Sequence, residues 1–107
     1  MSAIDDLQAN AAQPFEQARA MPPSVYTDSA FLQAELSNIF SQDWFCVGRA
    51  DALANEGDYL TLDLAGQPIV ALRDGQGQLR AMSNVCRHRM STLLQGRGNI
   101  RSIVCPY

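Results

Sequence analysis

The spacing of apolar residues first follows the period of an α-helix. In "TDSAFLQAELSNIF", Leu32, Leu36 and Phe40 recur every four residues and form one apolar stripe. The Thr-Asp pair at the start of this segment supplies an N-cap, because either side chain can accept from the free N–H groups of a first helical turn. The pattern predicts a helix over roughly residues 28–40.

The residues before this helix predict a less regular arm. Residues 1–20 can form a weakly amphipathic helix that Pro14 interrupts. The two prolines in "MPPSVY" break the chain again, since proline cannot continue a helix and keeps the preceding residue extended. We therefore expect an arm over residues 1–23 and a separate helical segment over residues 24–43.

From residue 44 the pattern changes to the period of two that β-strands require. "DYLTLDL" alternates cleanly, with Leu60, Leu62 and Leu64 on one side. "AGQP" and "DGQGQ" carry the glycines that tight turns need. The predicted strands are "WFCVGRA", "DYLTLDL", "IVALR", "LRAMSNV" and "IRSIV", and "CRHRMSTLLQGRGN" is predicted to be a loop. The expected fold is mainly β: a helical arm followed by an antiparallel β-domain over residues 44–107.

Composition fits one small globular domain. The 107 residues are 47% hydrophobic and 18% charged. The longest apolar runs have about four residues, far fewer than the roughly 20 that a membrane-spanning helix needs. The N-terminal "MSAIDDLQAN" has two aspartates, no basic residue and no apolar core, so it does not have the pattern of a signal peptide. We therefore expect a cytoplasmic protein with no membrane partner.

The net charge of −3 hides an asymmetry along the chain. Residues 1–74 hold all eleven acids and three arginines, a net −8, whereas residues 75–107 hold five arginines and no acid, a net +5. The basic part is either a solvated face or a patch that docks a negatively charged partner. A nucleic-acid partner is not expected, because the whole chain is acidic and no aromatic residues interleave the arginines.

Three residues in the basic part are candidate metal ligands. The chain has three cysteines, an odd number that in a reducing compartment favours metal or catalytic use over a disulfide framework. A strand end and a loop place Cys86 and His88 together, and a second strand end brings Cys105 alongside. This C-x-H spacing, followed by a further cysteine, resembles a Rieske centre, in which two cysteines hold one iron of a [2Fe–2S] cluster and two histidines hold the other.

Two other interpretations of these residues stay open. Zinc also accepts cysteine and histidine, although structural zinc sites separate paired ligands by two to four residues and C-x-H is tighter than that. The bland interpretation is a buried cysteine pair and an ordinary surface histidine. The Rieske spacing places the fourth ligand three residues after Cys105, one position beyond Tyr107. We therefore expect the sequence to be truncated inside its metal site.

Longer segments extend the resemblance. "NVCRHRMSTLLQGRG" and "SIVCPY" resemble the Rieske domain of ring-hydroxylating, Rieske non-haem iron oxygenase large (α) subunits. "YTDSAFLQAELSNIF" and "DWFCVGRADAL" are similar to the start of such subunits, so the resemblance covers about residues 24–107. It implies a Rieske-type β-domain in which Cys86 and Cys105 bind one iron and His88 binds the other.

The same resemblance implies a function in electron transfer. The domain would relay electrons from a reductase or ferredoxin to a mononuclear non-haem Fe(II), which in this family lies in a separate catalytic domain and activates O₂ for hydroxylation or demethylation. In many members the cluster serves a neighbouring subunit of a trimer. No catalytic residue is expected within the chain itself. A stand-alone Rieske ferredoxin is the alternative, against which the helix at residues 28–40 argues, and a metal-free β-domain for protein contacts is the third possibility.

Details of the motif and its surroundings give further expectations. No extra cysteine lies near residues 86 or 105, which resembles the low-potential oxygenase type. Many oxygenases have glycine where this chain has Met90, so the backbone there is less free to take a positive φ. Cys46, Trp44 and Phe45 are expected to pack in the core.

The arginines beside the candidate histidine have two interpretations. Arg87 and Arg89 flank His88 and either keep the loop soluble or donate to carboxylates of a partner, which is an acidic ferredoxin or a neighbouring catalytic domain.

Overall fold

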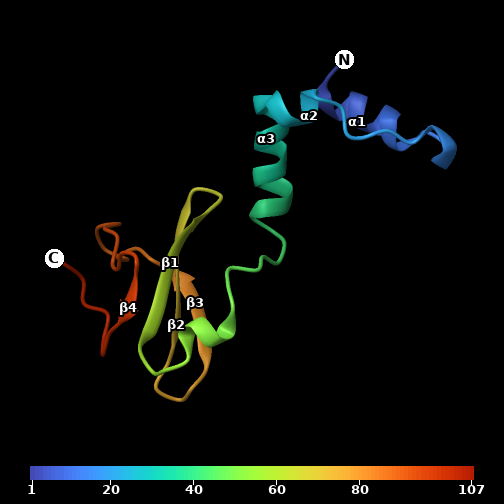
Figure 1. Ribbon diagram of the computed structural model, residues 1–107. Helices are drawn as coiled ribbons and strands as arrows, with labels where there is room; N and C mark the ends of the chain where they lie inside the picture. Colours follow the sequence, from blue (N-terminus) through green and yellow to red (C-terminus); the bar gives the residue numbers. More distant parts are fainter. The chain divides into compact units, whose positions relative to one another are not determined.

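The computed structural model describes all 107 residues and divides them into two compact units, Met1–Trp44 and Phe45–Tyr107 (Figure 1). The first unit is helical and the second contains the β-sheet. None of the helices combines the length and the apolar composition that crossing a membrane requires.

Short helices make up the first unit, as the sequence predicts. Ser2 begins the first helix with a capping box, because its hydroxyl accepts from the Asp5 N–H while the Asp5 carboxylate accepts from the Ser2 N–H. The helix ends before Pro14, where the sequence predicts an interruption. In chain order the elements are α1 (Ala3–Ala11), η1 (Phe15–Gln17), α2 (Ser24–Thr27), α3 (Ser29–Glu35) and the π-helical turn η2 (Leu36–Phe40).

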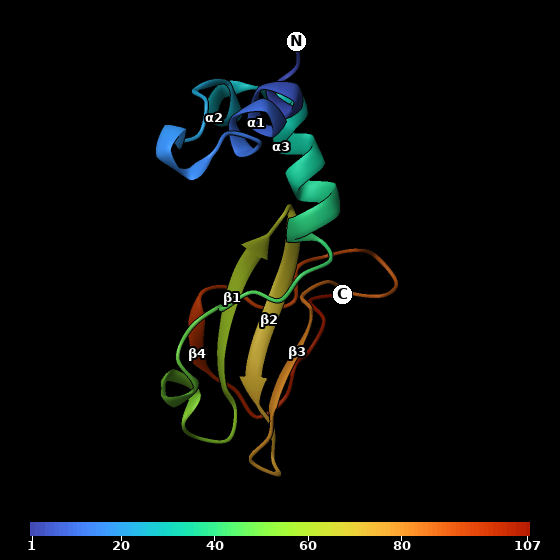
Figure 2. The same cartoon turned by 90° about the vertical axis from the view of Figure 1, so that its right-hand side faces the viewer.

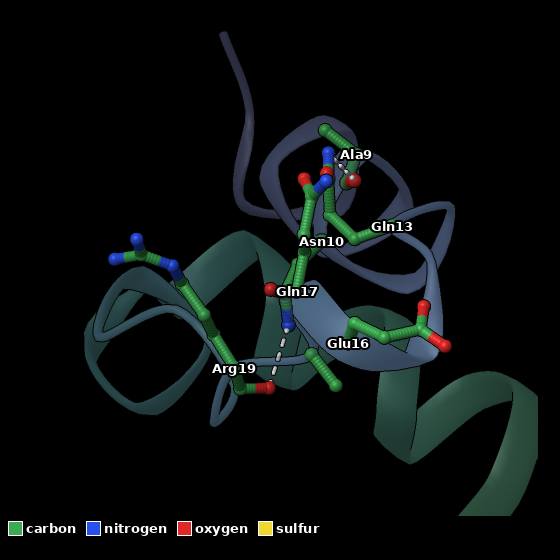
Figure 3. A pocket seen from close by; sticks show the side chains of 7 residues that line it. Ala9, Asn10, Gln13, Glu16, Gln17 and Arg19 are labelled. Carbon is green, nitrogen blue, oxygen red and sulfur yellow. Dashed lines mark hydrogen bonds between the residues drawn. The ribbon is translucent and has the colours of Figure 1, made fainter.

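A side-chain amide closes the segment between α1 and α2. Asn10 Nδ2 donates to the backbone oxygen of Arg19 at 3.4 Å and to that of Ala20 at 3.2 Å. Figure 3 shows this contact at an open polar hollow that Gln13 and Glu16 also line. The amide holds the segment after η1 against the end of α1.

The helix predicted over residues 28–40 is confirmed as α3 and η2, which together end at Phe40. Asp28 is its N-cap, and its carboxylate accepts from the Phe31 N–H at 2.7 Å. Its apolar residues are only partly covered, since Leu32 of the stripe remains 48% exposed and the neighbouring Ile39 46% exposed.

The second unit is a four-stranded antiparallel sheet in the order β3-β2-β1-β4 (Figure 2). A two-residue turn, Ala65 and Gly66 at φ +53° and +79°, joins the first two strands. Such a turn matches the twist of a hairpin, and the glycine takes its positive φ without steric cost. The strands are β1 (Asp58–Leu64), β2 (Gln67–Arg73), β3 (Leu79–Ser83) and β4 (Arg97–Asn99).

Alternation along the strands places the core on one face of the sheet. Leu60, Ala71 and Leu53 are buried together, and Leu62 packs against them. Leu53 belongs to the short helix η3 (Ala50–Leu53), which precedes β1.

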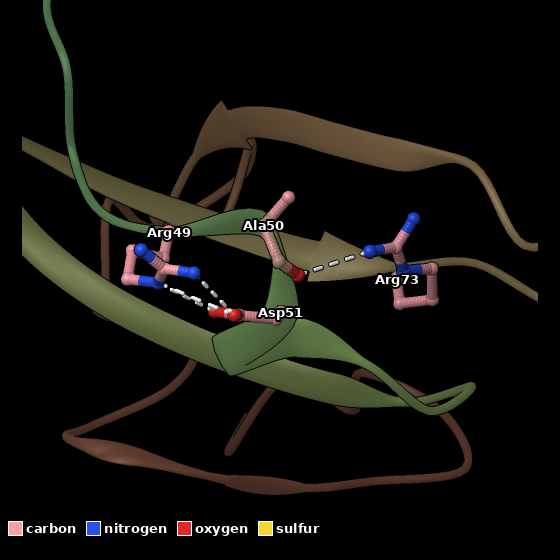
Figure 4. A network of polar contacts seen from close by, with 4 residues as sticks. All are labelled: Arg49, Ala50, Asp51 and Arg73. Carbon is pink, nitrogen blue, oxygen red and sulfur yellow. Dashed lines mark hydrogen bonds and ion pairs between the residues drawn. The ribbon is translucent and has the colours of Figure 1, made fainter.

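One arginine of the sheet fixes η3 in place. Arg73 donates to the backbone oxygen of Leu53 at 2.6 Å. It also donates to the backbone oxygen of Ala50 at 3.1 Å (Figure 4). Beside this contact, an exposed ion pair joins Arg49 and Asp51 at 2.7 Å. The Arg73 guanidinium therefore donates to two backbone carbonyls of η3, and β2, the strand that carries Arg73, contributes Ala71 to the core.

Two predicted strands are wrong. "WFCVGRA" pairs with no strand, and "IRSIV" lies outside the sheet. The outer edge of β1 is instead covered by β4, which lies in the predicted loop. Gly98 explains this, because a Cβ at that position would come within 3.2 Å of the Tyr59 ring across the pair. The glycine that predicts a loop is the residue that lets β4 pack against β1.

The segment between the helices and η3 also corrects an expectation. Trp44 and Cys46 are exposed, Trp44 completely so at 101%, whereas Phe45 is half-buried. A strand position that pairs with no neighbour has no sheet face on which to bury its side chain. Only Phe45 of the three expected core residues is therefore partly buried.

Candidate metal centre

A buried asparagine supports the base of the first candidate loop. Asn84 follows the end of β3 and is 2% exposed. Its Nδ2 donates to the Leu94 oxygen at 2.8 Å, and its Oδ1 accepts from the Leu94 N–H at 3.0 Å. The Asn84 N–H donates to the Pro68 oxygen at 2.9 Å. This one side chain therefore ties both ends of the loop together.

The loop itself is tight and leaves its tip exposed. The Cys86 N–H donates to the Ser91 oxygen at 2.7 Å, and the Met90 N–H donates to the Cys86 oxygen at 3.0 Å. Met90 takes φ +59°, although the sequence predicts that a side chain at this position makes a positive φ harder to reach. Closing the loop imposes the left-handed conformation, which costs a residue other than glycine on the order of 1 kcal/mol.

The sulfur of Cys86 lies in a site that favours its charged form. Cys86 is 6% exposed. Hydrogen bonds from the backbone N–H groups of His88 and Arg89, in that order of importance, and then from Cys105 lower the pKa of the Cys86 thiol to about 6. The thiolate is the form of cysteine that binds metals. The first loop is therefore built to present an anionic sulfur at neutral pH.

The three predicted ligands lie around one hollow. A cavity of about 500 Å³ is lined by Cys86, His88, Arg89, Cys105 and Tyr107. The Nδ1 atom of His88 lies 3.9 Å from the Cys86 sulfur, and the His88 N–H donates to that sulfur at 3.4 Å. All three cysteines are free thiols, and Cys46 does not line this hollow.

Cys105 reaches the hollow without the strand that the sequence predicts. The Ile100 N–H donates to the Gly57 oxygen at 3.0 Å, but residues 101–107 make no backbone hydrogen bond. Gly57 permits this approach, since a Cβ there would collide with the Ile100 oxygen. An extended segment therefore carries Cys105 to Cys86.

No group of three or more His, Cys, Asp and Glu side chains is arranged to hold one metal ion. In a Rieske cluster the protein donors are divided between two irons, two sulfurs on one and imidazoles on the other. Cys86 and Cys105 both line the hollow, and the Nδ1 atom of His88 lies beside the Cys86 sulfur.

Sequence reasoning missed the role of Asn84. The residue stands two positions before Cys86, at the end of a predicted strand, and a short amide there is a signal for side-chain bonding to nearby backbone. Its partner Leu94 is ten residues away, so sequence alone does not identify the contact.

The chain is similar to known proteins. Residues 43–107 match the Rieske [2Fe-2S] domain family. The chain is 39% identical over 93 residues to the carnitine monooxygenase oxygenase subunit of Escherichia coli K12, covering 86% of this chain and 25% of that protein. It is also 39% identical over 94 residues to the chloroplastic choline monooxygenase of Spinacia oleracea, covering 88% of this chain and 21% of that protein.

A solved structure extends the likeness to the fold. A quaternary ammonium Rieske monooxygenase in complex with gamma-butyrobetaine superposes with a TM-score of 0.79 at 38% identity, covering 96% of this chain and 29% of that one. The chain thus spans about a quarter of the length of these relatives. Its relatives are oxygenase subunits, and the chain belongs to the Rieske [2Fe-2S] domain family.

Proposed function

We propose that Cys86, Cys105 and His88 hold a Rieske-type [2Fe–2S] cluster, the two cysteines on one iron and the histidine on the other. The observation that carries the proposal is the meeting of these three side chains at one hollow inside the segment that matches the Rieske family. The family match also makes zinc and a metal-free contact domain poorer accounts of the same residues. The cluster, when bound, accepts and releases one electron at a time.

Residues around the hollow stabilise the charge on one candidate ligand and leave another candidate ligand exposed. Backbone N–H groups of His88 and Arg89 donate to the Cys86 sulfur and stabilise its negative charge. Hydrogen-bond donors to a cluster sulfur favour the reduced, more negative state. His88 is exposed, so it provides a short path between the hollow and solvent or a docked protein. The buried Cys86 and the exposed His88 therefore give the site a protected side and an accessible side.

A spectroscopic experiment tests the ligand assignment. The full-length polypeptide that contains this chain is purified anaerobically and reduced, and its electron paramagnetic resonance signal is examined for nitrogen hyperfine coupling. We expect coupling to imidazole nitrogen, and we expect His88→Ala to weaken that coupling or to abolish the signal. A reduced wild-type protein whose cluster signal has no nitrogen coupling contradicts the proposal.

We further propose that the chain is the Rieske part of an oxygenase α subunit, and that its cluster passes electrons to a mononuclear non-haem iron. A relative of that kind covers 96% of the chain, which takes in most of both units. A stand-alone ferredoxin is the weaker alternative, because the matched relatives are oxygenase subunits several times longer than this chain. Metal analysis separates the two: the oxygenase has an iron beyond the cluster pair, whereas the ferredoxin has only the cluster.

Quaternary ammonium compounds are the substrate class that we propose for this oxygenase. The relatives act, by their names, on carnitine and choline, and the matched structure holds gamma-butyrobetaine. The test is oxygen uptake by the full-length enzyme with its reductase and each of these compounds. Uptake with an aromatic hydrocarbon but with none of them would replace the substrate class while leaving the oxygenase assignment intact.

An acidic electron donor, a reductase or ferredoxin, is the partner that we propose for the basic part of the chain. Arg87 is exposed beside His88, and residues 75–107 carry no acid. Arg87→Gln should slow reduction by the donor and weaken the dependence of that rate on salt. Arg97→Gln in β4 removes the same charge away from the hollow and serves as the matched control. Equal effects of the two substitutions contradict docking at the hollow.

We also propose that the oxygenase assembles as a trimer. Light scattering of the full-length protein tests this oligomeric state.

A further inference from the structure

The segment that carries Cys105 is tied to the first loop by side chains alone. Residues 101–107 make no backbone hydrogen bond. No disulfide joins the two segments, since all three cysteines are free. One stacking contact connects them at the edge of the hollow that Cys86 and Cys105 both line.

That stacking contact joins Arg89 to Tyr107. The Arg89 Cζ atom lies 5.2 Å from the centre of the Tyr107 ring, within the range of a cation–π interaction. Both side chains line the hollow with the candidate ligands. The ion pairs of the structure use Arg49 and Arg80, so no carboxylate pairs with Arg89.

We propose that Arg89 and Tyr107 form a clamp, which holds the two ligand-bearing segments together and keeps a positive charge at the rim of the cluster hollow. The proposal rests on the proposed [2Fe–2S] function of this site. Arg89 follows His88 directly, and Tyr107 stands two residues after Cys105, so the stack spans the two segments beside their ligands. The planar guanidinium suits this role, because it stacks on an aromatic face while it retains its charge.

The clamp has two separable consequences. Holding the second segment slows the opening that would let the cluster escape, so the stack sets how fast iron is lost. A fixed positive charge at the rim favours the state with the added electron, so Arg89 also raises the midpoint potential. Neither effect makes Arg89 or Tyr107 a ligand; both are positioning residues.

Release of iron to a chelator from the holoprotein tests the first consequence. Arg89→Gln and Tyr107→Leu should each release iron about two- to fivefold faster than wild type, as an exposed cation–π contact implies. Tyr107→Phe keeps the ring and should match wild type. Arg87→Gln removes the same charge from the other side of His88, where no ring is stacked, and should also match wild type. The clamp is wrong if Arg87→Gln and Arg89→Gln accelerate release equally, or if Tyr107→Leu has no effect.

The midpoint potential tests the second consequence and separates it from a merely structural role. Arg89→Gln should lower the equilibrium constant for reduction roughly threefold, which is about 30 mV at 59 mV per tenfold for one electron. Arg89→Lys keeps the charge and should leave the potential near that of wild type. Equal potentials for Arg89→Gln and wild type contradict the assigned role of the charge.

A measurement on the cluster-free protein distinguishes failure of the clamp from failure of the cluster assignment. In the apo form of the full-length polypeptide, the ring current of Tyr107 should shift the Arg89 side-chain protons upfield, and Tyr107→Leu should abolish that shift. Absence of the shift in wild type overturns the clamp even where a cluster can be loaded. Presence of the shift in a protein that never binds a cluster supports the contact and counts only against the proposed function.

Discussion

Replacement of Asn84 is the perturbation for which the structure gives the clearest magnitude. Its amide makes two hydrogen bonds to Leu94, at 2.8 and 3.0 Å, in a position that is 2% exposed. Each such bond contributes about 1 kcal/mol, and each backbone group left buried without a partner costs about 1–3 kcal/mol. We expect Asn84→Ala to lower the free energy of unfolding by about 2–4 kcal/mol, and the melting temperature by on the order of 10 °C.

Urea unfolding followed by circular dichroism measures this change. Asn84→Asp keeps the acceptor for the Leu94 N–H but turns an acceptor toward the Leu94 carbonyl, so it should destabilise the protein at least as much. Gln95→Ala is the matched control, because that exposed side chain is adjacent and makes no hydrogen bond, and it should change stability by less than about 0.5 kcal/mol. A loss below about 0.5 kcal/mol for Asn84→Ala would refute the view that this amide holds the loop.

Three further substitutions test other parts of the structure. Gly57→Ala places a Cβ against the Ile100 oxygen at φ +85°, so urea unfolding should show a loss of about 2 kcal/mol or more. The Asn99 amide and a backbone N–H lower the pKa of Asp58 below its ordinary 3.8. The stability that this carboxylate supplies is therefore present above pH 3.8 and is lost as the pH falls through the folded pKa. Asp58→Asn should reduce the loss of unfolding free energy at acid pH. Met90→Val should destabilise the loop by about 1–2 kcal/mol more than Met90→Gly in the same assay, because a β-branched residue tolerates φ +59° poorly.

The spacing of apolar residues along the chain predicts most of the helices and strands, because that spacing determines which face of each element can be buried. The four-residue spacing after Asp28 identifies α3, and the alternation around Leu60 identifies β1. The failures both concern pairing, because a segment becomes a strand only when it pairs with a neighbour. "WFCVGRA" has strand composition but no partner, whereas a glycine at position 98 lets an unpromising segment pair with Tyr59.

The candidate site divides in the same way. The spacing of Cys86, His88 and Cys105 in the sequence identifies them as candidate ligands, and in the structure all three line one hollow. The supports of the site depend on contacts between distant residues, such as the amide of Asn84 with Leu94, and no periodicity encodes those. The positive φ of Met90 is likewise imposed by hydrogen bonds that close the loop, against the preference of the residue itself.

Iron and acid-labile sulfide content, compared among three cysteine variants, tests the cluster assignment most directly. In the anaerobically purified full-length polypeptide, Cys46→Ser should keep two irons and two sulfides per cluster, because Cys46 is exposed and lies outside the hollow. Cys86→Ser and Cys105→Ser should each lose most of both, with the far-ultraviolet circular dichroism of the sheet retained. Full iron and sulfide in a folded Cys86→Ser or Cys105→Ser protein, or loss of both in Cys46→Ser alone, would contradict the assignment.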